Sequence, residues 1–314
     1  MRDKVVTLFG GTGFVGTQIV KRLAERGATI RAVTRAPHRA LHLKPLGNVG
    51  QINLVPWRGG GVEALRTLVR GTDLVVNLVG ILFEGRKGDF MRVHADFAGN
   101  VASAAKAEGV PRLLHMSALG ADPDSPALYG RSKAEGEKRV MAAFKDATVF
   151  RPSIVFGPGD GFFERFGRMM AYVPAAPLID GGTTRFQPVY VGDVADAFVT
   201  AAERPDAKGR LYELGGPGTY TFKELLAYLA GVLDRRCLFV PLPSGLARFQ
   251  ARFLEYLPEP PLTRDQLELL KVDNVVGGTR PGLEDLGITP TPIETTVPAY
   301  IKGYVRRRPA MPTQ

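Results

Sequence analysis

Residues 5–20 read VVTLFGGTGFVGTQIV, and they carry the strongest indication of fold in the chain. A short apolar, β-branched run is followed by Gly10, Gly13 and Gly16 at three-residue intervals, and then by apolar residues at helical spacing. The pattern predicts a strand, a glycine-rich turn and a helix in direct succession. Glycines allow the tight turn and let a diphosphate approach backbone N–H groups at the positive end of the helix. We therefore interpret the stretch as the start of a dinucleotide-binding βαβ unit, with an ordinary structural turn as the alternative.

Strand and helix patterns alternate outward from this stretch through the first half of the chain. Alternation of this kind favours a parallel sheet with helices on both faces, and right-handed crossovers leave few other topologies. We expect an α/β protein with a doubly wound parallel sheet of the Rossmann type and a smaller C-terminal second lobe. The expected strands are 4–10, 28–35, 50–57, 73–80, 110–120 and 147–157, and the expected helices are 17–27, 61–71, 89–109 and 129–144.

The pattern changes from about residue 157, where Pro and aromatic residues become frequent and the regular alternation stops. Residues 187–205 again read as a strand leading into a helix capped by Asp193, and we expect this stretch to return to the main sheet. The remainder predicts a lobe over the carboxyl ends of the strands, where ligands of such folds bind. The expected division is a NAD(P)-binding domain of residues 1–156 plus about 187–215, and a substrate or partner lobe of residues 157–186 plus 216–314.

Composition limits the possible classes of site. The 314 residues are 45% hydrophobic and 23% charged, as in ordinary globular proteins. One cysteine, Cys237, and four scattered histidines predict neither an internal disulfide nor a metal site. No apolar run reaches about 18 residues, and the apolar run at the N-terminus is too short for a signal peptide. We therefore expect a cytoplasmic protein.

The formal net charge is +10, but basic residues are spread along the chain. The one tight basic run is Arg306, Arg307 and Arg308 near the C-terminus. Such a spread favours an anionic cofactor, an acidic partner or an anionic membrane surface over nucleic acid. No nucleic-acid partner is expected.

The end of the second predicted strand bears on the choice of nucleotide. NAD sites usually place a carboxylate there, but this chain has Thr34 and Arg35, with Arg39 one helical turn on. A carboxylate repels a 2′-phosphate, whereas a guanidinium pairs with it, so the sequence predicts NADP(H) rather than NAD(H). The alternative is an ordinary solvated arginine. Trp57 and Arg58 follow the third strand and either flank the adenine or, for Trp57, belong to the core. The other expected cofactor contacts are Thr12, Phe14, Val15, Leu78, Val79, Gly80, Pro152 and Ile154.

A candidate catalytic group combines Ser117, Tyr129 and Lys133. Tyr129 and Lys133 share one face of a predicted helix, and Ser117 ends the strand before it. A Tyr-x-x-x-Lys spacing arises readily by chance, but in this position the three form the triad of short-chain dehydrogenases/reductases. Lys133 would hold the nicotinamide ribose and lower the pKa of Tyr129. Tyr129 would then protonate a carbonyl oxygen to which Ser117 donates a hydrogen bond. The same residues also occur in proteins that only bind nucleotide.

The remainder of the chain resembles one family more specifically, the alpha-subcomplex subunit 9 family of respiratory complex I. This family comprises an NADPH-binding accessory subunit and its bacterial homologues, all atypical or extended short-chain dehydrogenases. The stretches that carry the resemblance are HLKPLGNVGQI (42–52), DLVVNLVG (73–80), QPVYVGDVADA (187–197), PPLTRDQLELLKVDNVV (260–276) and PGLEDLGITPTPIE (281–294).

The resemblance implies a firmly held NADPH in a structural role, with complex I or its assembly intermediates as partner, near the membrane and the quinone site. Arg58 departs from the family, which has an acidic residue after the Trp. Because no targeting presequence is evident, the chain looks bacterial, and we expect it in the cytoplasm or peripherally on the cytoplasmic face of the inner membrane. The positions that match the family's nucleotide-binding residues are Gly10, Gly13, Gly16, Arg35, Tyr129 and Lys133.

Two features of the second lobe keep alternatives open. An apolar stripe flanked by Arg248 and Arg252 either lies on an anionic membrane or partner helix, or packs into the lobe's own core, which is the interpretation we favour. A set of aromatic and Met residues suits a hydrophobic ligand or belongs to the core. The second function we consider is an NADP(H)-dependent reductase, dehydrogenase or epimerase that acts on a hydrophobic carbonyl such as a quinone or quinone precursor. The stripe is Leu246, Phe249, Phe253 and Leu257, and the aromatic and Met set is Phe162, Phe163, Phe166, Met169 and Met170.

Overall fold

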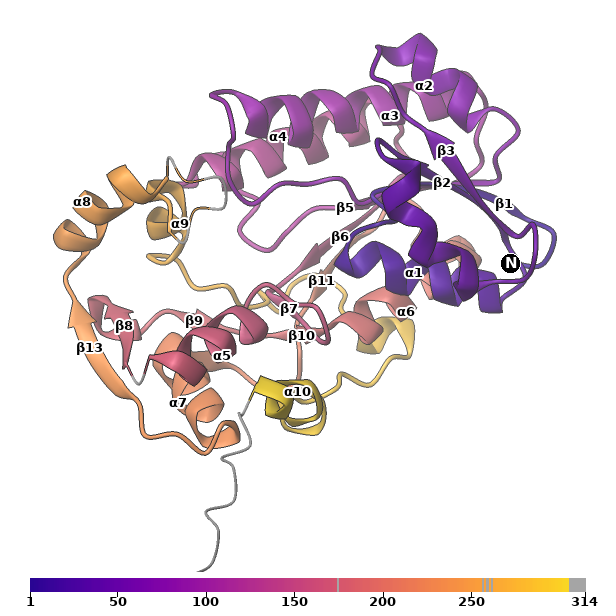
Figure 1. Cartoon of the computed structure of the whole chain (residues 1–314). Helices are drawn as coiled ribbons and strands as arrows, with labels where there is room; N and C mark the ends of the chain where they lie inside the picture. Colours follow the sequence, from indigo (N-terminus) through magenta and orange to yellow (C-terminus); the bar gives the residue numbers. More distant parts are fainter. Residues whose placement is uncertain (174, 256, 258–259, 261, 305–314) are drawn as a thin grey trace, which may run out of the picture.

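The computed structural model describes residues 1–173, 175–255, 257, 260 and 262–304, which form two lobes (Figure 1). The larger lobe is built on a seven-stranded sheet of order β11-β6-β5-β4-β1-β2-β3, in which every neighbouring pair is parallel. The doubly wound parallel sheet expected from the sequence is therefore confirmed. Its strands are β1 (Val5–Phe9), β2 (Thr29–Thr34), β3 (Ile52–Pro56), β4 (Leu74–Asn77), β5 (Leu113–Met116), β6 (Thr148–Pro152) and β11 (Leu211–Leu214).

Helices cover both faces of this sheet (Figure 1). On one face α1 (Phe14–Glu25) packs beside α6 (Val191–Glu203); on the other α3 (Phe97–Ala107) lies between α2 (Val62–Val69) and α4 (Leu128–Ala143). Two apolar clusters fill the layers between helices and sheet. The strands are mostly apolar because both of their faces are covered, as is usual in parallel sheets. A 3-10 helix, η1 (Pro37–Leu46), follows β2, and η4 (Pro205–Ala207) follows α6.

The long helix expected at 89–109 contains a wider turn. A π-helical segment, η2 (Met91–Asp96), precedes α3, and it brings His94 against the neighbouring helix α4. A β-carbon on Gly136 of α4 would stand 2.0 Å from the His94 carbonyl oxygen, so the two helices approach closely here. Single π turns inside α-helices are common near functional sites.

The smaller lobe has its own apolar core, in which Phe163 and Met170 are fully buried and Phe162, Phe166 and Met169 pack around them. These residues are therefore core residues, as the second interpretation of the sequence had it. The helices of this lobe are α5 (Phe163–Tyr172), α7 (Phe222–Val232), α8 (Ser244–Leu254), α9 (Arg264–Leu269) and α10 (Ile293–Ile301), with short turns η3 (Asp180–Gly182) and η6 (Lys302–Tyr304). The turn η5 (Glu284–Leu286) packs instead against α6 of the larger lobe. The two-stranded pairs outside the main sheet are β7 (Val155–Phe156) with β10 (Val189–Tyr190), β8 (Ala175–Ile179) with β13 (Leu238–Leu242), and β9 (Arg185–Phe186) with β12 (Tyr220–Thr221).

Two expectations for residues 187–205 are corrected. The strand β10 pairs with β7 in a separate two-stranded sheet, and only the helix α6 returns to the main sheet. Asp193 does not cap α6: it lies inside the helix, whose N-cap is Tyr190. Its carboxylate instead accepts hydrogen bonds from the backbone N–H and the hydroxyl of Thr291, at 2.7 and 2.9 Å. The hydrogen bonds to Thr291, which is distant in sequence, thus take the place of bonds to the start of α6.

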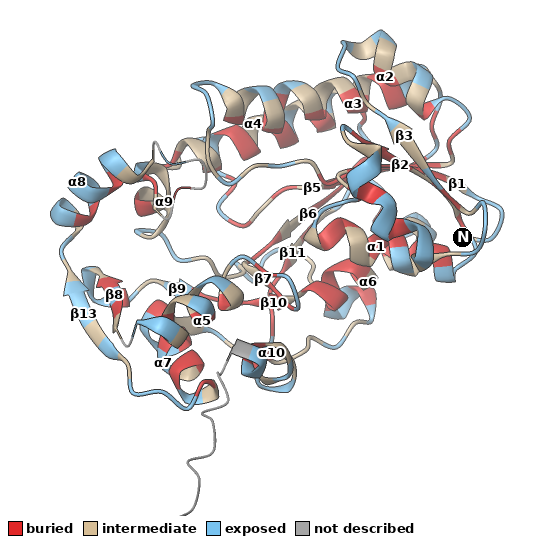
Figure 2. Cartoon of the chain, viewed as in Figure 1, coloured by how far each residue is buried: buried red, intermediate tan, exposed pale blue. Residues whose placement is uncertain are grey.

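The apolar stripe of α8 is exposed, so the core packing that we favoured from the sequence is wrong. Phe249 and Phe253 are each 62% exposed, and Leu246 and Leu257 are each 50% exposed. The helix turns Ala247 and Ala251 inward instead, because these small residues let it approach α9 closely. Figure 2 shows the outward face of α8 as exposed. The basic run at 306–308 lies outside the described residues. Within the described part of the chain, no helix combines the length and apolarity needed to cross a bilayer.

Candidate nucleotide-binding site

The glycine turn after β1 is too tight for side chains. Gly10 has φ +84°, and a β-carbon there would stand 3.0 Å from the carbonyl carbon of Leu78. A β-carbon on Gly16 would stand 2.2 Å from the Gly10 carbonyl oxygen, well inside any real contact. Gly13 is the N-cap of α1 and has more room. The turn thus keeps backbone, rather than side chains, at the carboxyl end of β1.

The first turn of α1 is suited to an anion. No side chain caps this helix, and its first turn holds no acidic residue. The N–H of Thr17 bonds back to the Gly13 carbonyl at 2.9 Å, so the N–H groups before it are available at the positive end of the helix. Phe14 and Val15 supply two of these N–H groups, and Thr12 is exposed in the turn itself. The residues present therefore fit a dinucleotide diphosphate.

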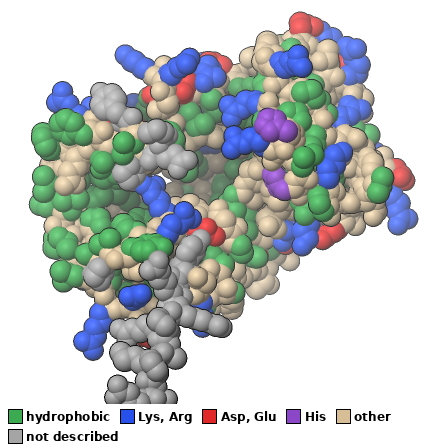
Figure 3. All heavy atoms as spheres, in the orientation of Figure 1, with side chains coloured by type: hydrophobic (Ala, Val, Ile, Leu, Met, Phe, Trp, Pro, Cys, Tyr) green, Lys and Arg blue, Asp and Glu red, His purple; other side chains and the backbone are tan. Residues whose placement is uncertain are grey.

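Two arginines lie beyond the end of β2. Arg35 and Arg39 are both exposed, and neither has a carboxylate partner among the residues that the structure describes. Thr34 fixes the bend before them, because its hydroxyl accepts the N–H of Ala36 at 3.2 Å. Figure 3 shows a recess between the two lobes, with Lys and Arg side chains along its rim. Free guanidiniums at this edge can pair with a phosphate.

The adenine end of the site follows β3. Trp57 is half-buried, packs at 6.1 Å from the ring of Phe97, and belongs to the rim of the apolar cluster under α2 and α3. The backbone N–H of Trp57 donates to the Thr34 carbonyl at 2.8 Å, which ties the end of β3 to the bend after β2. Arg58 is exposed beside it. Trp57 thus packs against the apolar cluster while staying half-exposed, and its contact with an adenine stays a prediction.

The fourth and sixth strands supply the remaining walls. Leu78 is buried beneath Gly10, and the N–H of Val79 donates to the side-chain oxygen of Asn77 at 3.2 Å. Gly80 is exposed, and a β-carbon on it would stand 3.3 Å from Lys133 Nζ. At the end of β6, the carbonyl oxygen of Pro152 accepts the N–H of Leu119, which follows β5, and the carbonyl oxygen of Ile154 accepts the N–H of Val189 in β10.

The structure brings Ser117, Tyr129 and Lys133 to one end of the sheet. Ser117 follows β5 directly, and Lys133 Nζ reaches the carbonyl oxygen of Met116 at 3.4 Å. The same ammonium is 5.9 Å from the ring centroid of Tyr129. Ser117 Oγ is buried without a hydrogen-bond partner among the described residues. The same holds for His115 Nε2, two residues earlier on the same side of β5. Unpartnered polar atoms at the end of a strand indicate a place where a ligand or water completes the bonding.

Burial dominates the electrostatics of this pair. It raises the pKa of Tyr129 to about 12, and it lowers the pKa of Lys133 to about 8, an effect that Glu137 partly opposes. The charge of Glu137 is already matched by Arg151, which donates to it at 2.8 and 2.6 Å. The pKa of Tyr129 therefore lies above its ordinary value, opposite to the direction expected from Lys133, and desolvation of the phenol is the cause. Tyr129 remains protonated throughout the neutral range.

His94 is a site residue that the sequence did not reveal. Its Nε2 accepts the N–H of Ile81 at 3.0 Å, and its Nδ1 is 2.9 Å from Ser132 Oγ. Because Ser132 Oγ donates to the Tyr129 carbonyl at 2.8 Å, Nδ1 carries the proton and the imidazole is neutral. Burial and the charge of Lys133 lower the pKa of His94 to about 3. The only sequence signal for it was a lone polar residue on an apolar helix face.

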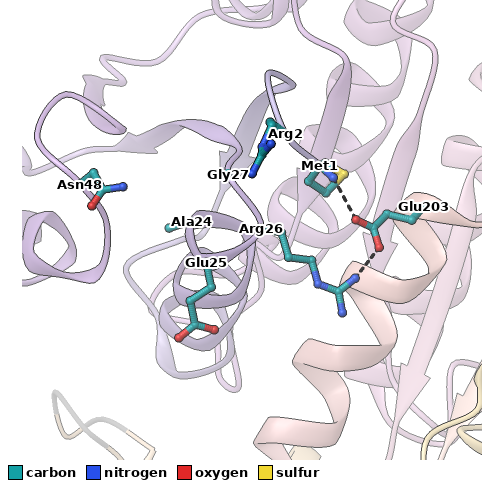
Figure 4. A pocket seen from close by; sticks show the side chains of 8 residues that line it. All are labelled: Met1, Arg2, Ala24, Glu25, Arg26, Gly27, Asn48 and Glu203. Carbon is teal, nitrogen blue, oxygen red and sulfur yellow. Dashed lines mark hydrogen bonds and ion pairs between the residues drawn. The ribbon is translucent and has the colours of Figure 1, made fainter.

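A second hollow lies away from the glycine turn and is unrelated to this chemistry. A shallow cavity of about 740 Å³ lies at the amino ends of β1 and β2, opposite the glycine turn (Figure 4). Of the two carboxylates that line it, Glu203 is already paired with the N-terminal amino group at 3.0 Å and with Arg26, and Glu25 lies 4.0 Å from Lys21. No group of three or more His, Cys, Asp or Glu side chains placed to hold a metal ion occurs in the described ranges.

Comparison with known proteins agrees with this geometry. The model of the NAD dependent epimerase/dehydratase family matches residues 6–215. The mitochondrial NADH dehydrogenase [ubiquinone] 1 alpha subcomplex subunit 9 of Rattus norvegicus is 36% identical over 293 residues, which cover 92% of this chain and 78% of that protein. A ceramide reductase of Caulobacter vibrioides is 29% identical over 241 residues, covering 76% and 74%.

Among solved structures, the crystal structure of gox2253 superposes with a TM-score of 0.73 at 21% identity, covering 98% of this chain and all of that one. At this identity the superposition shows the fold alone. The match extends over both lobes, so the smaller lobe is part of the shared architecture.

Proposed function

We propose that this chain, which belongs to the NAD dependent epimerase/dehydratase family and has subunit 9 of complex I among its homologues, holds NADP(H) as a structural nucleotide in an accessory or assembly subunit of respiratory complex I. The observation that carries the proposal is the 36% identity to the rat subunit across 92% of this chain, because that span includes the smaller lobe. A relation confined to the glycine turn would indicate only a nucleotide-binding fold.

The preference for NADP(H) rests on charge. Arg35 and Arg39 follow β2 at the place where NAD-binding proteins of this fold use a carboxylate. Their guanidiniums have no ion-pair partner within the described residues and so are available to a 2′-phosphate. A nucleotide that binds only the native state stabilises it by mass action, about 2.7 kcal/mol at 100-fold over Kd, which gives it a structural use without turnover.

The second candidate is a reductase, dehydrogenase or epimerase acting on a hydrophobic carbonyl such as a quinone or quinone precursor. The triad and the relation to a ceramide reductase favour it. In this reading the bound nucleotide supplies or accepts hydride. Lys133 holds the ribose hydroxyls, Ser117 donates a hydrogen bond to the substrate oxygen, and Tyr129 gives that oxygen its proton. The raised pKa keeps Tyr129 protonated at neutral pH, the form that a proton donor needs, although it also makes the phenol a weaker acid.

Exchange and turnover separate the two candidates. The protein is purified without added nucleotide, the released nucleotide is identified by chromatography, and its exchange with labelled NADPH is timed. The structural role predicts near-stoichiometric NADP(H), slow exchange, and no oxidation of NADPH by quinones or long-chain ketones. Rapid exchange with carbonyl-dependent oxidation that Tyr129→Phe abolishes would establish the enzyme instead.

The partner surface we propose includes α8. Its exposed side chains Leu246, Phe249 and Phe253 are joined by Leu257 just beyond the helix and by Leu238 and Val240 of the preceding β13, which are 69% and 43% exposed. Figure 3 shows hydrophobic side chains gathered over this edge of the smaller lobe. Apolar residues with arginines nearby favour a membrane-proximal position on a complex I arm, on the cytoplasmic face if the chain is bacterial. Co-migration with complex I in a native gel, lost on Phe249→Ser/Phe253→Ser, tests this placement; unchanged migration of the double variant contradicts it.

A further inference from the structure

The segment 263–276, one of the stretches that carry the family resemblance, crosses the carboxyl edge of the main sheet. It begins at α9 in the smaller lobe, where Thr263 and Gln266 form a reciprocal capping box that fixes the start of that helix. It ends at Asn274, whose side-chain oxygen accepts the hydroxyl of Ser153 at 2.7 Å and whose amide nitrogen is 3.4 Å from the Leu119 carbonyl oxygen. Leu119 and Ser153 follow β5 and β6, so the segment joins the smaller lobe to both strand ends.

Asp265 makes the most consequential contact of this segment. Its carboxylate accepts the backbone N–H groups of Leu128 and Tyr129, at 2.6 and 3.1 Å. These are the first two residues of α4, the helix that carries Tyr129 and Lys133. The N-cap of α4 is Ala127, which has no side chain able to cap, and the first turn of α4 holds no acidic residue. The positive end of α4 is therefore satisfied by a carboxylate 137 residues away, from the other lobe.

We propose that Asp265 is a positioning residue for Tyr129 and Lys133. The inference rests on the proposed nucleotide function and identifies the residue that positions the side chains at the nicotinamide half of the site. Tyr129 lies in the first turn of α4, which frays when the N–H groups of that turn lose their acceptor. Lys133 is one turn further on, and its ammonium must stay near the Met116 carbonyl to reach a ribose. Holding the helix start thus holds both side chains.

The geometry predicts an effect confined to one half of the nucleotide. The glycine turn and Arg35 belong to β1, α1 and β2, none of which contacts Asp265 through a hydrogen bond in the described residues. Loss of Asp265 should therefore weaken contacts to the nicotinamide ribose and leave those to the diphosphate and the 2′-phosphate unchanged. Adenosine 2′,5′-bisphosphate, which lacks the nicotinamide half, distinguishes the two sets of contacts.

The experiment compares NADPH with adenosine 2′,5′-bisphosphate by calorimetric titration of nucleotide-free full-length protein. Asp265→Ala should weaken NADPH binding by about 3- to 10-fold, the loss expected for a helix cap, and change bisphosphate binding by less than about 2-fold. The NADPH affinity of Asp265→Asn, which keeps one acceptor oxygen, should fall between the affinities of Asp265→Ala and wild type. The Asn variant provides the same comparison if the Ala variant does not fold. Asp273→Ala is the matched control: it removes a carboxylate of the same segment that accepts the N–H of Arg185 at 2.8 Å and touches nothing on α4.

Two outcomes overturn the inference. Unchanged NADPH affinity in both Asp265 variants would show that α4 needs no cap to present Tyr129 and Lys133. An equal loss for both ligands, or the same loss in Asp273→Ala, would show that Asp265 supports the fold generally. Failure of the wild-type protein to bind either ligand contradicts the proposed function itself, and this result is distinct from the others.

Discussion

At the scale of single residues, we propose that Arg35 sets the choice of nucleotide. It is exposed at the end of β2 without an ion-pair partner in the described ranges, so its charge is available to a phosphate. Arg35→Asp should weaken NADPH binding by about 10- to 100-fold and leave NADH binding equal or improved, because a carboxylate repels the 2′-phosphate and accepts ribose hydroxyls. Titration of both nucleotides checks this. Arg236→Asp, which changes another exposed arginine in the smaller lobe, is the control. An unchanged nucleotide preference in Arg35→Asp would contradict the role of Arg35.

The buried ammonium of Lys133 should make the stability of the protein depend on pH. Burial lowers its pKa from 10.5 to about 8, so between these values the unfolded state binds more protons than the folded state. The free energy of unfolding contributed by this group therefore rises with pH across that window and is flat below about pH 8. Relative to Lys133→Met, the nucleotide-free wild type should gain on the order of 2–3 kcal/mol between pH 7.5 and 10.5 in urea unfolding. Parallel pH profiles of the two proteins would show that Lys133 is not desolvated.

At the scale of elements, the β1–α1 turn depends on the absence of a side chain at Gly16. A β-carbon there would stand 2.2 Å from a backbone oxygen that cannot move without displacing the turn. Gly16→Ala should destabilise the protein by about 1–3 kcal/mol and abolish nucleotide binding, measured by urea unfolding and titration. Gly231→Ala, on α7 with open space around it, should instead be neutral or stabilising by about 0.5–1 kcal/mol. Equal effects of the two substitutions would contradict the close packing of the turn.

The elements also show what the sequence can and cannot predict. The main sheet follows from local signals, because apolar β-branched runs and glycine stops lie within the strands and turns themselves. The outward face of α8 does not, because its stripe has the spacing of a core helix and only the packing of Ala247 on α9 decides its orientation. Asp193 and Asp265 each bond to backbone about 100 or more residues away. Contacts at such separations leave no periodic pattern to read.

At the scale of the whole molecule, the nucleotide site is built from both lobes. β1, β2 and α4 supply its walls, and the smaller lobe supplies the carboxylate that holds α4. NADPH at 100-fold over Kd should therefore raise the unfolding midpoint of the entire chain by about 5 °C in a single transition, and NADH at the same concentration should raise it less. Differential scanning calorimetry checks both points. A shift confined to one of two separate transitions would show that the lobes respond independently.

The most direct measurement is a crystal structure of the protein grown with NADPH. The account predicts one nucleotide at the carboxyl edge of the sheet, with its diphosphate on the first-turn N–H groups of α1 and its 2′-phosphate within hydrogen-bond distance of the Arg35 guanidinium. A nucleotide bound elsewhere, or a 2′-phosphate turned toward solvent and away from both Arg35 and Arg39, would contradict it.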